Sequence, residues 1–221
     1  MTTSASGLAA PTGLSADDGA RWERIRLLYQ LPVAGATARL LVVGNRGSEL
    51  SRGWPGDVEV WPLDQLAARL QQGDPGAFDV VAIPGLLSTG GRVGIDGLAG
   101  APFFAALSRR LAPGGVLAGD VRRSWASRRG PAPSGVRSLR ATLERGGLVD
   151  IECYFVRPSM DDPMALIPAD TRAARAHFQR QLACTRPQFT ALGYALRRMA
   201  VTCGLGARNH PSIFFWARRP C

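Results

Sequence analysis

Short continuous runs of apolar residues alternate along the chain with segments in which apolar positions recur every three or four residues. Continuous apolar runs rich in β-branched residues are typical of strands that are buried on both faces of a parallel sheet. The runs predict strands at residues 38–44, 58–63, 78–85, 116–121, 148–158 and 212–220.

The segments with helical spacing lie between these runs. They predict helices at residues 21–31, 63–72, 102–115 and 136–147, and two more inside a long insertion at 159–210. Pro-Gly-Gly closes the third helix and Gly-Gly the fourth, and both are helix stop signals. Strands that alternate with helices predict a doubly wound α/β sheet.

The chain of 221 residues fits one domain, which we place at 21–221, preceded by a flexible tail at 1–20 that is rich in Ser, Ala and Gly. Residues 157–170, rich in Pro and Asp, predict an ordered loop that crosses the top of the sheet, with Asp170 as the N-cap of the next helix. Residues 159–210 then form a helical lid.

Composition narrows the function classes. Apolar residues make up 46% of the chain and charged residues 20%, as in a globular protein. The sequence holds no apolar run of transmembrane length and no signal-peptide pattern, so we expect a cytoplasmic location. Its four cysteines are scattered without a Cys-x-x-Cys pair, and we expect reduced thiols and no metal site.

The positive charge is unevenly distributed. All 27 basic residues are arginines, a usage that fits the coding bias of a GC-rich bacterial genome. Nine of them, and no Asp or Glu, fall between Thr171 and Cys221, whereas 18 arginines and 17 acids share the first 170 residues. This basic quarter would attract an anionic substrate, a carrier protein, nucleic acid or an anionic membrane surface. A solvated arginine-rich surface is the alternative interpretation.

Three motifs resemble the class I S-adenosylmethionine-dependent methyltransferases. They are LLVVGNRG at 40–47, FDVVAIPGLL at 78–87 and LSRRLAPGGVLAGDV at 107–121, and the resemblance extends over about residues 38–220. It implies a Rossmann-like, mostly parallel sheet that ends in an antiparallel hairpin, with S-adenosylmethionine as the cofactor. It also implies a methyltransferase acting on a small molecule or a saccharide in bacterial secondary-metabolite or glycan biosynthesis.

The resemblance also implies a cofactor site. In open α/β sheets, ligands bind beyond the carboxyl ends of the strands, at the point where the strand order reverses. A glycine-rich turn there lets the ligand approach the backbone. The residues that the resemblance places around the cofactor follow the first, second and third strands: Gly44, Asn45, Arg46, Gly47, Trp61, Asp64, Pro84, Gly85 and Leu86.

The chain departs from the family pattern at three of these places. Val42 replaces an acid in the first strand, the turn keeps at most two of three glycines, and Trp61 stands where the ribose-binding acid is expected. Only a short segment separates Asp64 from Phe78, so one strand of the family is missing or very short. The alternative function is therefore a methyltransferase-like protein that has lost methyl transfer and acts as a partner, a scaffold or a repurposed catalyst.

The candidate catalytic residues are His177, Asp120 and Tyr154. A histidine can serve as a general base near neutral pH, although a surface histidine is the more common case. Asp120 ends a strand and could instead cap a turn, and Tyr154 could simply alternate with core positions. The other candidates are His210, a second possible base, and Arg123 and Arg157, which could hold an anionic acceptor.

Nucleic-acid binding through the basic quarter ranks last. Few aromatic residues accompany its arginines, and the sequence contains no RNA-binding module. We therefore expect a small-molecule or glycosidic partner, and the sequence leaves a homodimer open.

Overall fold

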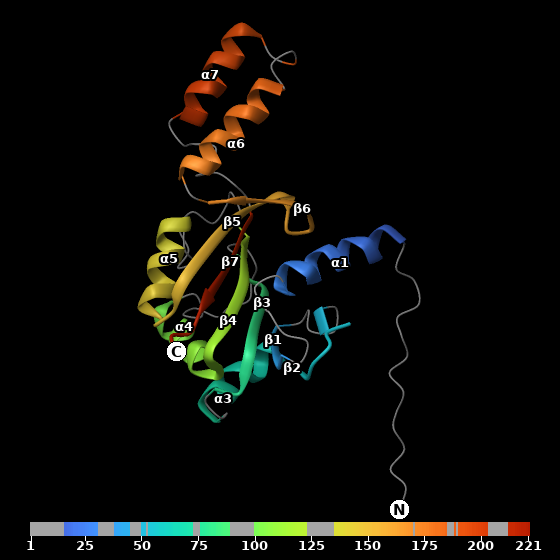
Figure 1. Cartoon of the computed structure of the whole chain (residues 1–221), viewed down its shortest axis with the longest axis vertical. Coiled ribbons are helices and arrows are strands. Elements are labelled where there is room, and N and C mark those ends of the chain that lie inside the picture. The colour runs from blue at the N-terminus through green and yellow to red at the C-terminus, as the bar shows by residue number, and fades with distance from the viewer. Residues whose placement is uncertain are drawn as a thin grey trace, which may run out of the picture.

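The structure is a computed structural model, and it describes residues 16–30, 38–44, 50–51, 53–72, 76–88, 100–122, 135–169, 171–184, 188, 190–202 and 212–221. Within these ranges the chain forms a seven-stranded sheet with helices on both of its faces (Figure 1). The strands are β1 (Leu40–Val43), β2 (Val58–Trp61), β3 (Phe78–Ser88), β4 (Leu111–Arg122), β5 (Val149–Ser159), β6 (Asp162–Pro168) and β7 (Ser212–Arg218). The helices are α1 (Ala16–Gln30), α3 (Leu63–Gln72), α4 (Ala101–Arg110), α5 (Val136–Arg145), α6 (Thr171–Cys184) and α7 (Ala191–Thr202).

The strands lie in the order β2-β1-β3-β4-β7-β5-β6. β2, β1, β3 and β4 are mutually parallel, and β7 is antiparallel to both β4 and β5. β5 consequently runs in the same direction as β4, and β6 returns antiparallel to β5. The predicted fold, a mostly parallel doubly wound sheet with an antiparallel hairpin at its end, is confirmed.

Alternate residues of each strand face opposite layers because side chains along a strand alternate with a period of two. Leu41 and Val43 of β1 contact the cluster beneath α3, α4 and α5, whereas Leu40 and Val42 contact the cluster beneath α1. Both sets are buried, which explains why the sequence of β1 is a continuous apolar run rather than an alternating one.

Aromatic residues join the layers on the larger side of the sheet. Phe104 of α4 is fully buried, and its ring meets Phe215 of β7 edge to face at a centroid distance of 6.3 Å. Phe155 of β5 packs in the same cluster against Phe178 of α6, so the helical insertion shares the main core.

Most predicted elements match the structure within a few residues, and the differences have physical causes. α1 begins at Ala16, so part of the segment assigned to the tail is helical. α4 ends at Arg110, because the Pro-Gly-Gly segment belongs to a bulge at the start of β4. There Leu111 pairs with Phe78, and the next pair is Val116 with Val80.

The predicted loop at residues 157–170 is wrong, since β5 continues to Ser159 and β6 follows at Asp162–Pro168. Val156 pairs with Leu166 and Tyr154 with Pro168, so the backbone of this segment bonds to β5. Pro163 and Ile167 are buried, whereas Met164 and Ala165 face solvent. Prolines fit here because β6 is the edge strand of the sheet. Asp170, the predicted N-cap, lies outside the described residues.

At the other edge, the structure agrees with the expected loss of a strand. β2 is the outermost strand there, and between α3 and β3 the described residues contain no strand. Among the helices that the structure describes, none is long and apolar enough to cross a membrane.

Close packing at Gly119 of β4 gives a test of the core. A Cβ atom added there would lie 2.4 Å from a side-chain carbon of Ile83 and 2.8 Å from Phe215. We expect Gly119→Ala to lower the free energy of unfolding by about 1–3 kcal/mol, because overpacking forces both neighbours to shift. Denaturant unfolding measures this change.

Gly135→Ala is the matched control, because a Cβ atom added at Gly135 meets none of the described residues within 4 Å. Its cost should stay below about 1 kcal/mol, the range for replacing glycine by alanine at a helix N-cap. Equal losses in the two variants would contradict the packing of β4 against β3 and β7.

Candidate functional site

The carboxyl ends of β2, β1, β3 and β4 meet at one edge of the sheet because these strands are parallel. Along the chain, β1 connects to β2 on one side and the chain then returns to β3 on the other, so the strand order reverses at β1. Ligand sites of open α/β sheets lie at such a reversal. The structure brings Gly44, Trp61, Pro84, Gly85 and Asp120 to this edge.

Gly44 follows β1 directly at the reversal. Its φ of +118° is a backbone conformation that side chains disfavour, so glycine is required. Its N–H donates a hydrogen bond to the Trp61 carbonyl at 2.9 Å. Among the described residues, a Cβ atom added at Gly44 would meet only the Pro84 carbonyl, at 3.9 Å, so this part of the structure leaves the backbone open to a ligand. Asn45, Arg46 and Gly47 lie outside the described residues.

The Trp61 side chain belongs to the core. It is 4% exposed, and its ring meets Phe78 edge to face at a centroid distance of 6.0 Å. Its indole Nε1 donates to Glu59 Oε1 at 2.7 Å, and Arg69 of α3 donates to the same oxygen at 2.8 Å. The structure therefore favours core packing over stacking on an adenine ring.

Asp64 is the first carboxylate after β2, and it is exposed in the first turn of α3. Its Oδ1 accepts a hydrogen bond from the backbone N–H of Gln65 at 3.1 Å. This geometry leaves the carboxylate accessible beside the end of β2, so Asp64 can receive hydroxyl donors from a ligand at the edge.

Asp120 fixes the end of β3. Ile83 pairs with Gly119 and Leu87 with Val121, so three residues of β3, Pro84 to Leu86, bulge opposite Asp120 alone. The Asp120 side chain is 1% exposed, and its Oδ1 accepts the Gly85 N–H at 2.7 Å. Asp120 does not end its strand as predicted, because β4 continues to Arg122, and its side chain holds the neighbouring bulge instead. The Leu86 side chain lies outside the described residues.

Tyr29 of α1 donates its hydroxyl hydrogen to the same Oδ1 of Asp120 at 2.8 Å. Its ring meets Phe214 edge to face at 5.2 Å, so α1 is held against the sheet beside the edge. The helical spacing of the sequence placed Tyr29 on the buried side of its helix. Nothing in the sequence linked its hydroxyl to a carboxyl group 91 residues away.

Tyr154 shares a row of the sheet with Asp120, because both pair with Phe214. Its hydroxyl nevertheless donates to Glu152, and its ring packs against Trp216 at 4.8 Å. Burial, followed by the bond to Glu152, raises the pKa of Tyr154 above its ordinary value. Tyr154 therefore retains its proton, and the structure does not bring its hydroxyl to Asp120.

His177 lies on α6, where its ring meets Phe178 edge to face at 5.6 Å. Partial burial, followed by the charges of Arg157 and Arg180, lowers its pKa below the ordinary 6.5. At neutral pH the imidazole is therefore uncharged and can accept a proton. Figure 1 shows α6 and α7 beyond the carboxyl edge of the sheet. His210 and Arg123 lie outside the described residues.

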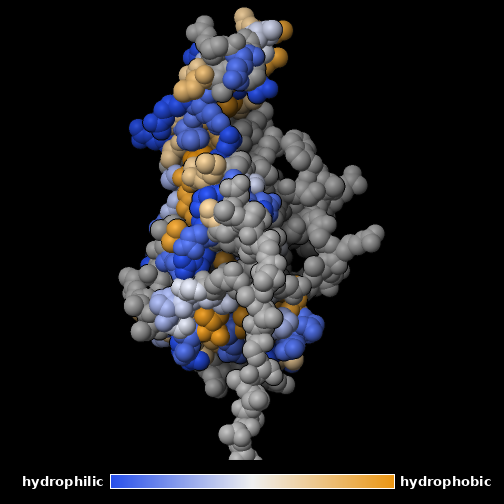
Figure 2. Space-filling model, turned by 90° about the vertical axis from the view of Figure 1, so that its right-hand side faces the viewer, coloured by the Kyte–Doolittle hydropathy of each residue, from blue (hydrophilic) through white to orange (hydrophobic). Residues whose placement is uncertain are grey.

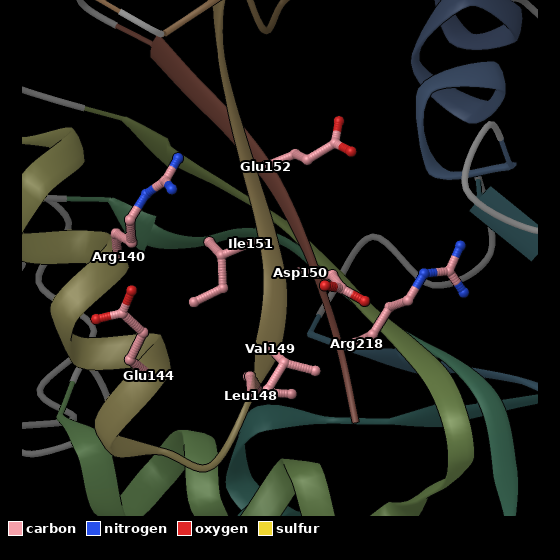
Figure 3. Close-up of a pocket in the computed structure, with 8 residues that line it drawn as sticks. All are labelled: Arg140, Glu144, Leu148, Val149, Asp150, Ile151, Glu152 and Arg218. Atoms are coloured by element: carbon pink, nitrogen blue, oxygen red, sulfur yellow. The ribbon is translucent and has the colours of Figure 1, made fainter. Parts of the chain in front are cut away.

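An open hollow of about 600 Å³ lies at the opposite edge of the sheet, at the start of β5. Figure 3 shows Arg140 and Glu144 of α5 on one side of β5, and Asp150 and Arg218 on the other. None of the sequence-predicted site residues lines this hollow. Since ligands of open α/β sheets bind at the carboxyl edge, the hollow does not displace the candidate site.

Comparison with known proteins rests on solved structures. No family model matches the sequence, and no curated protein matches it. Phosphoethanolamine N-methyltransferase 2 of Haemonchus contortus, in complex with S-adenosylhomocysteine, matches with a TM-score of 0.52 and 13% identity over 90% of this chain and 53% of its own. A SAM-dependent methyltransferase from Archaeoglobus fulgidus matches with a TM-score of 0.53 and 11% identity, over 90% of this chain and 94% of its own.

This chain has the class I methyltransferase fold. It spans about half the length of the Haemonchus enzymes that it matches. A probable spermidine synthase from Corynebacterium glutamicum also matches, with a TM-score of 0.50 and 12% identity over 91% of this chain and 63% of its own. At such low identities the likeness concerns the fold, which hosts more than one reaction.

The bond between Tyr29 and Asp120 can be measured. We expect Tyr29→Phe to lower the free energy of unfolding by about 1 kcal/mol, and Asp120→Ala by at least about 2 kcal/mol, because the latter leaves two buried donors without their acceptor. A double-mutant cycle with Tyr29→Phe and Asp120→Ala should show coupling of about 1 kcal/mol.

Tyr154→Phe is the matched control. The hydrogen bond of its hydroxyl is exposed, so its loss should lower the free energy of unfolding less. A coupling of zero would contradict the contact.

The pKa of His177 can be followed by NMR titration. Arg180→Gln removes a nearby positive charge, so we expect the midpoint to rise towards 6.5, whereas Arg175→Gln on the same helix should leave it unchanged. Because the folded-state pKa lies below the unfolded value, this residue reduces stability as the pH falls below 6.5. If the midpoint shifts in Arg175→Gln but not in Arg180→Gln, Arg180 is not the charge that lowers the pKa of His177.

Proposed function

We propose that this protein is an S-adenosylmethionine-dependent methyltransferase that acts on a small-molecule or saccharide acceptor in bacterial secondary-metabolite or glycan biosynthesis. The observation that carries the proposal is the open backbone of Gly44 at the strand-order reversal, beside the Pro84 carbonyl. A likeness in fold to S-adenosylmethionine-dependent methyltransferases supports it.

The described residues provide some of the groups that would bind S-adenosylmethionine. Gly44 offers a backbone that a ligand can approach, and Asp64 offers an exposed carboxylate for the ribose hydroxyls next to the end of β2. The bulge that contains Pro84 and Gly85 lies at the same edge, and Asp120 holds it through the Gly85 N–H. When bound there, the cofactor supplies an electrophilic methyl group, and the protein aligns the acceptor with it.

His177 is the group best suited to take a proton from the acceptor. Its lowered pKa keeps the imidazole uncharged at neutral pH, and α6 lies beyond the carboxyl edge. Asp120 serves as a positioning residue, because its buried Oδ1 accepts hydrogen bonds from the Tyr29 hydroxyl and the Gly85 N–H and so holds α1 and the β3 bulge in place. Tyr154 keeps its proton and its bond to Glu152, so the proposal gives it no role in proton removal.

Trp61 favours the alternative function, a methyltransferase-like protein that no longer transfers methyl groups. The side chain at the position expected for the ribose-binding acid is buried and apolar, and the described sheet ends at β2. A scaffold or a repurposed catalyst on this fold would need no ribose-binding acid there. Binding of the donor separates the two proposals.

Calorimetric titration with S-adenosylhomocysteine tests the proposal. We expect binding in the micromolar range for the wild type. Asp64→Asn should weaken it by about tenfold, the typical effect of losing the charge in a hydrogen-bonded pair. The matched control is Asp150→Asn at the opposite edge of the sheet, which should bind as the wild type does.

The outcomes are distinct. If the wild type binds and Asp64→Asn is unaffected, the donor site stands and the role of Asp64 is wrong. If the wild type shows no binding heat and no thermal shift with either S-adenosylhomocysteine or S-adenosylmethionine, methyl transfer is ruled out and the alternative function is favoured.

A further inference from the structure

α7 presents an apolar stripe to solvent. Leu192, Leu196 and Met199 recur at intervals of four and three residues, which places them on one face of the helix. Their exposed fractions are 71%, 53% and 60%, the largest run of exposed apolar side chains that the described residues place on one helix. The opposite face is the one that packs, since Val201 is partly buried against the main core.

Arginines lie elsewhere on the same helical pair. At 3.6 residues per turn, Arg197 and Arg198 lie about 130° from the stripe, one on each flank of the opposite face. α6 adds exposed Arg172, Arg175 and Arg180, and neither helix contains an acidic residue. Figure 2 shows hydrophobic and hydrophilic side chains next to each other over this helical pair at the top of the molecule. A helix with one apolar face and with arginines on its polar side is typical of helices that lie in a membrane interface.

Charge and apolarity together distinguish the three kinds of partner that could cover this stripe. A second copy of the chain would bring together two helical pairs that carry arginines and no acidic residue, which is repulsive. Nucleic acid would neutralise the arginines but gain nothing from Leu192, Leu196 and Met199. An anionic bilayer satisfies both features, because its acyl region receives apolar side chains while long arginine side chains reach its phosphates.

We propose that α7, supported by α6, docks the protein on the surface of an anionic phospholipid membrane. The helix lies flat, with Leu192, Leu196 and Met199 between the headgroups and the arginines of both helices on the lipid phosphates. This surface is independent of the proposed methyl transfer. Docking would hold the carboxyl edge of the sheet close to the membrane, since α6 and α7 lie beyond that edge (Figure 1).

Vesicle co-sedimentation tests the proposal with two probes, phosphatidylcholine vesicles and the same vesicles with roughly one third phosphatidylglycerol. We expect the full chain to bind the anionic vesicles and to leave the neutral ones, with affinity that falls as salt rises. Replacing Leu192, Leu196 and Met199 together by serine should lower the affinity about tenfold or more. Arg197→Gln with Arg198→Gln should lower it by roughly tenfold as well.

Two matched controls accompany these variants. Leu27→Ser with Val149→Ser changes exposed apolar residues elsewhere, and Arg109→Gln with Arg137→Gln removes two exposed charges on α4 and α5. Both should bind vesicles as the wild type does. Circular dichroism confirms that each variant is folded, which we expect because the altered side chains are exposed.

Three results would overturn the proposal. The first is no binding to anionic vesicles, or equal binding to neutral ones. The second is an equal loss of vesicle affinity in the α7 variants and in the controls, because binding would then depend on the total charge or apolarity of the protein and not on α7. The third is a dimer in sedimentation equilibrium that the triple serine variant dissociates, because the stripe would then be a contact between copies.

Discussion

The buried carboxyl group of Asp120 is the contact on which the candidate site depends. One oxygen accepts the Gly85 N–H from the bulge of β3 and the Tyr29 hydroxyl from α1, so a single atom in β4 fixes a neighbouring strand and a helix. A buried polar group costs free energy unless it is bonded, and this arrangement satisfies two donors and an acceptor together. The shape of the carboxyl edge between β3 and α1 follows from it.

The site at that edge is built largely from backbone. Gly44 leaves space beside the Pro84 carbonyl, and the bulge opposite Asp120 takes Pro84 to Leu86 out of the regular pairing with β4. Such a site depends less on particular side chains than on strand order and on one glycine conformation. This explains how the fold can be kept while the acid expected at Trp61 is absent.

The charge asymmetry of the chain also has a structural location. Five described arginines of the basic quarter lie on α6 and α7, the helical pair that also carries the exposed apolar stripe. Those at the end of β7 lie near the C-terminus, where Arg218 and Arg219 donate to backbone carbonyls. The arginines of the basic quarter therefore have two different settings, one bonded to the backbone and one on the surface of a helical pair. The arginine content of the sequence did not distinguish these two groups.

The sequence by itself determined the strands, most helices and the fold, because burial on both faces forces continuous apolar runs and glycine marks where helices stop. It also located Gly44, Pro84, Gly85 and Asp120 near one edge. Only the tertiary structure decided what these residues do. Tyr29 and Asp120 are bonded across 91 residues, Trp61 is buried by Phe78, and β6 exists because β5 offers a free edge. Contacts of this kind depend on which surfaces meet after folding, and no local pattern encodes them.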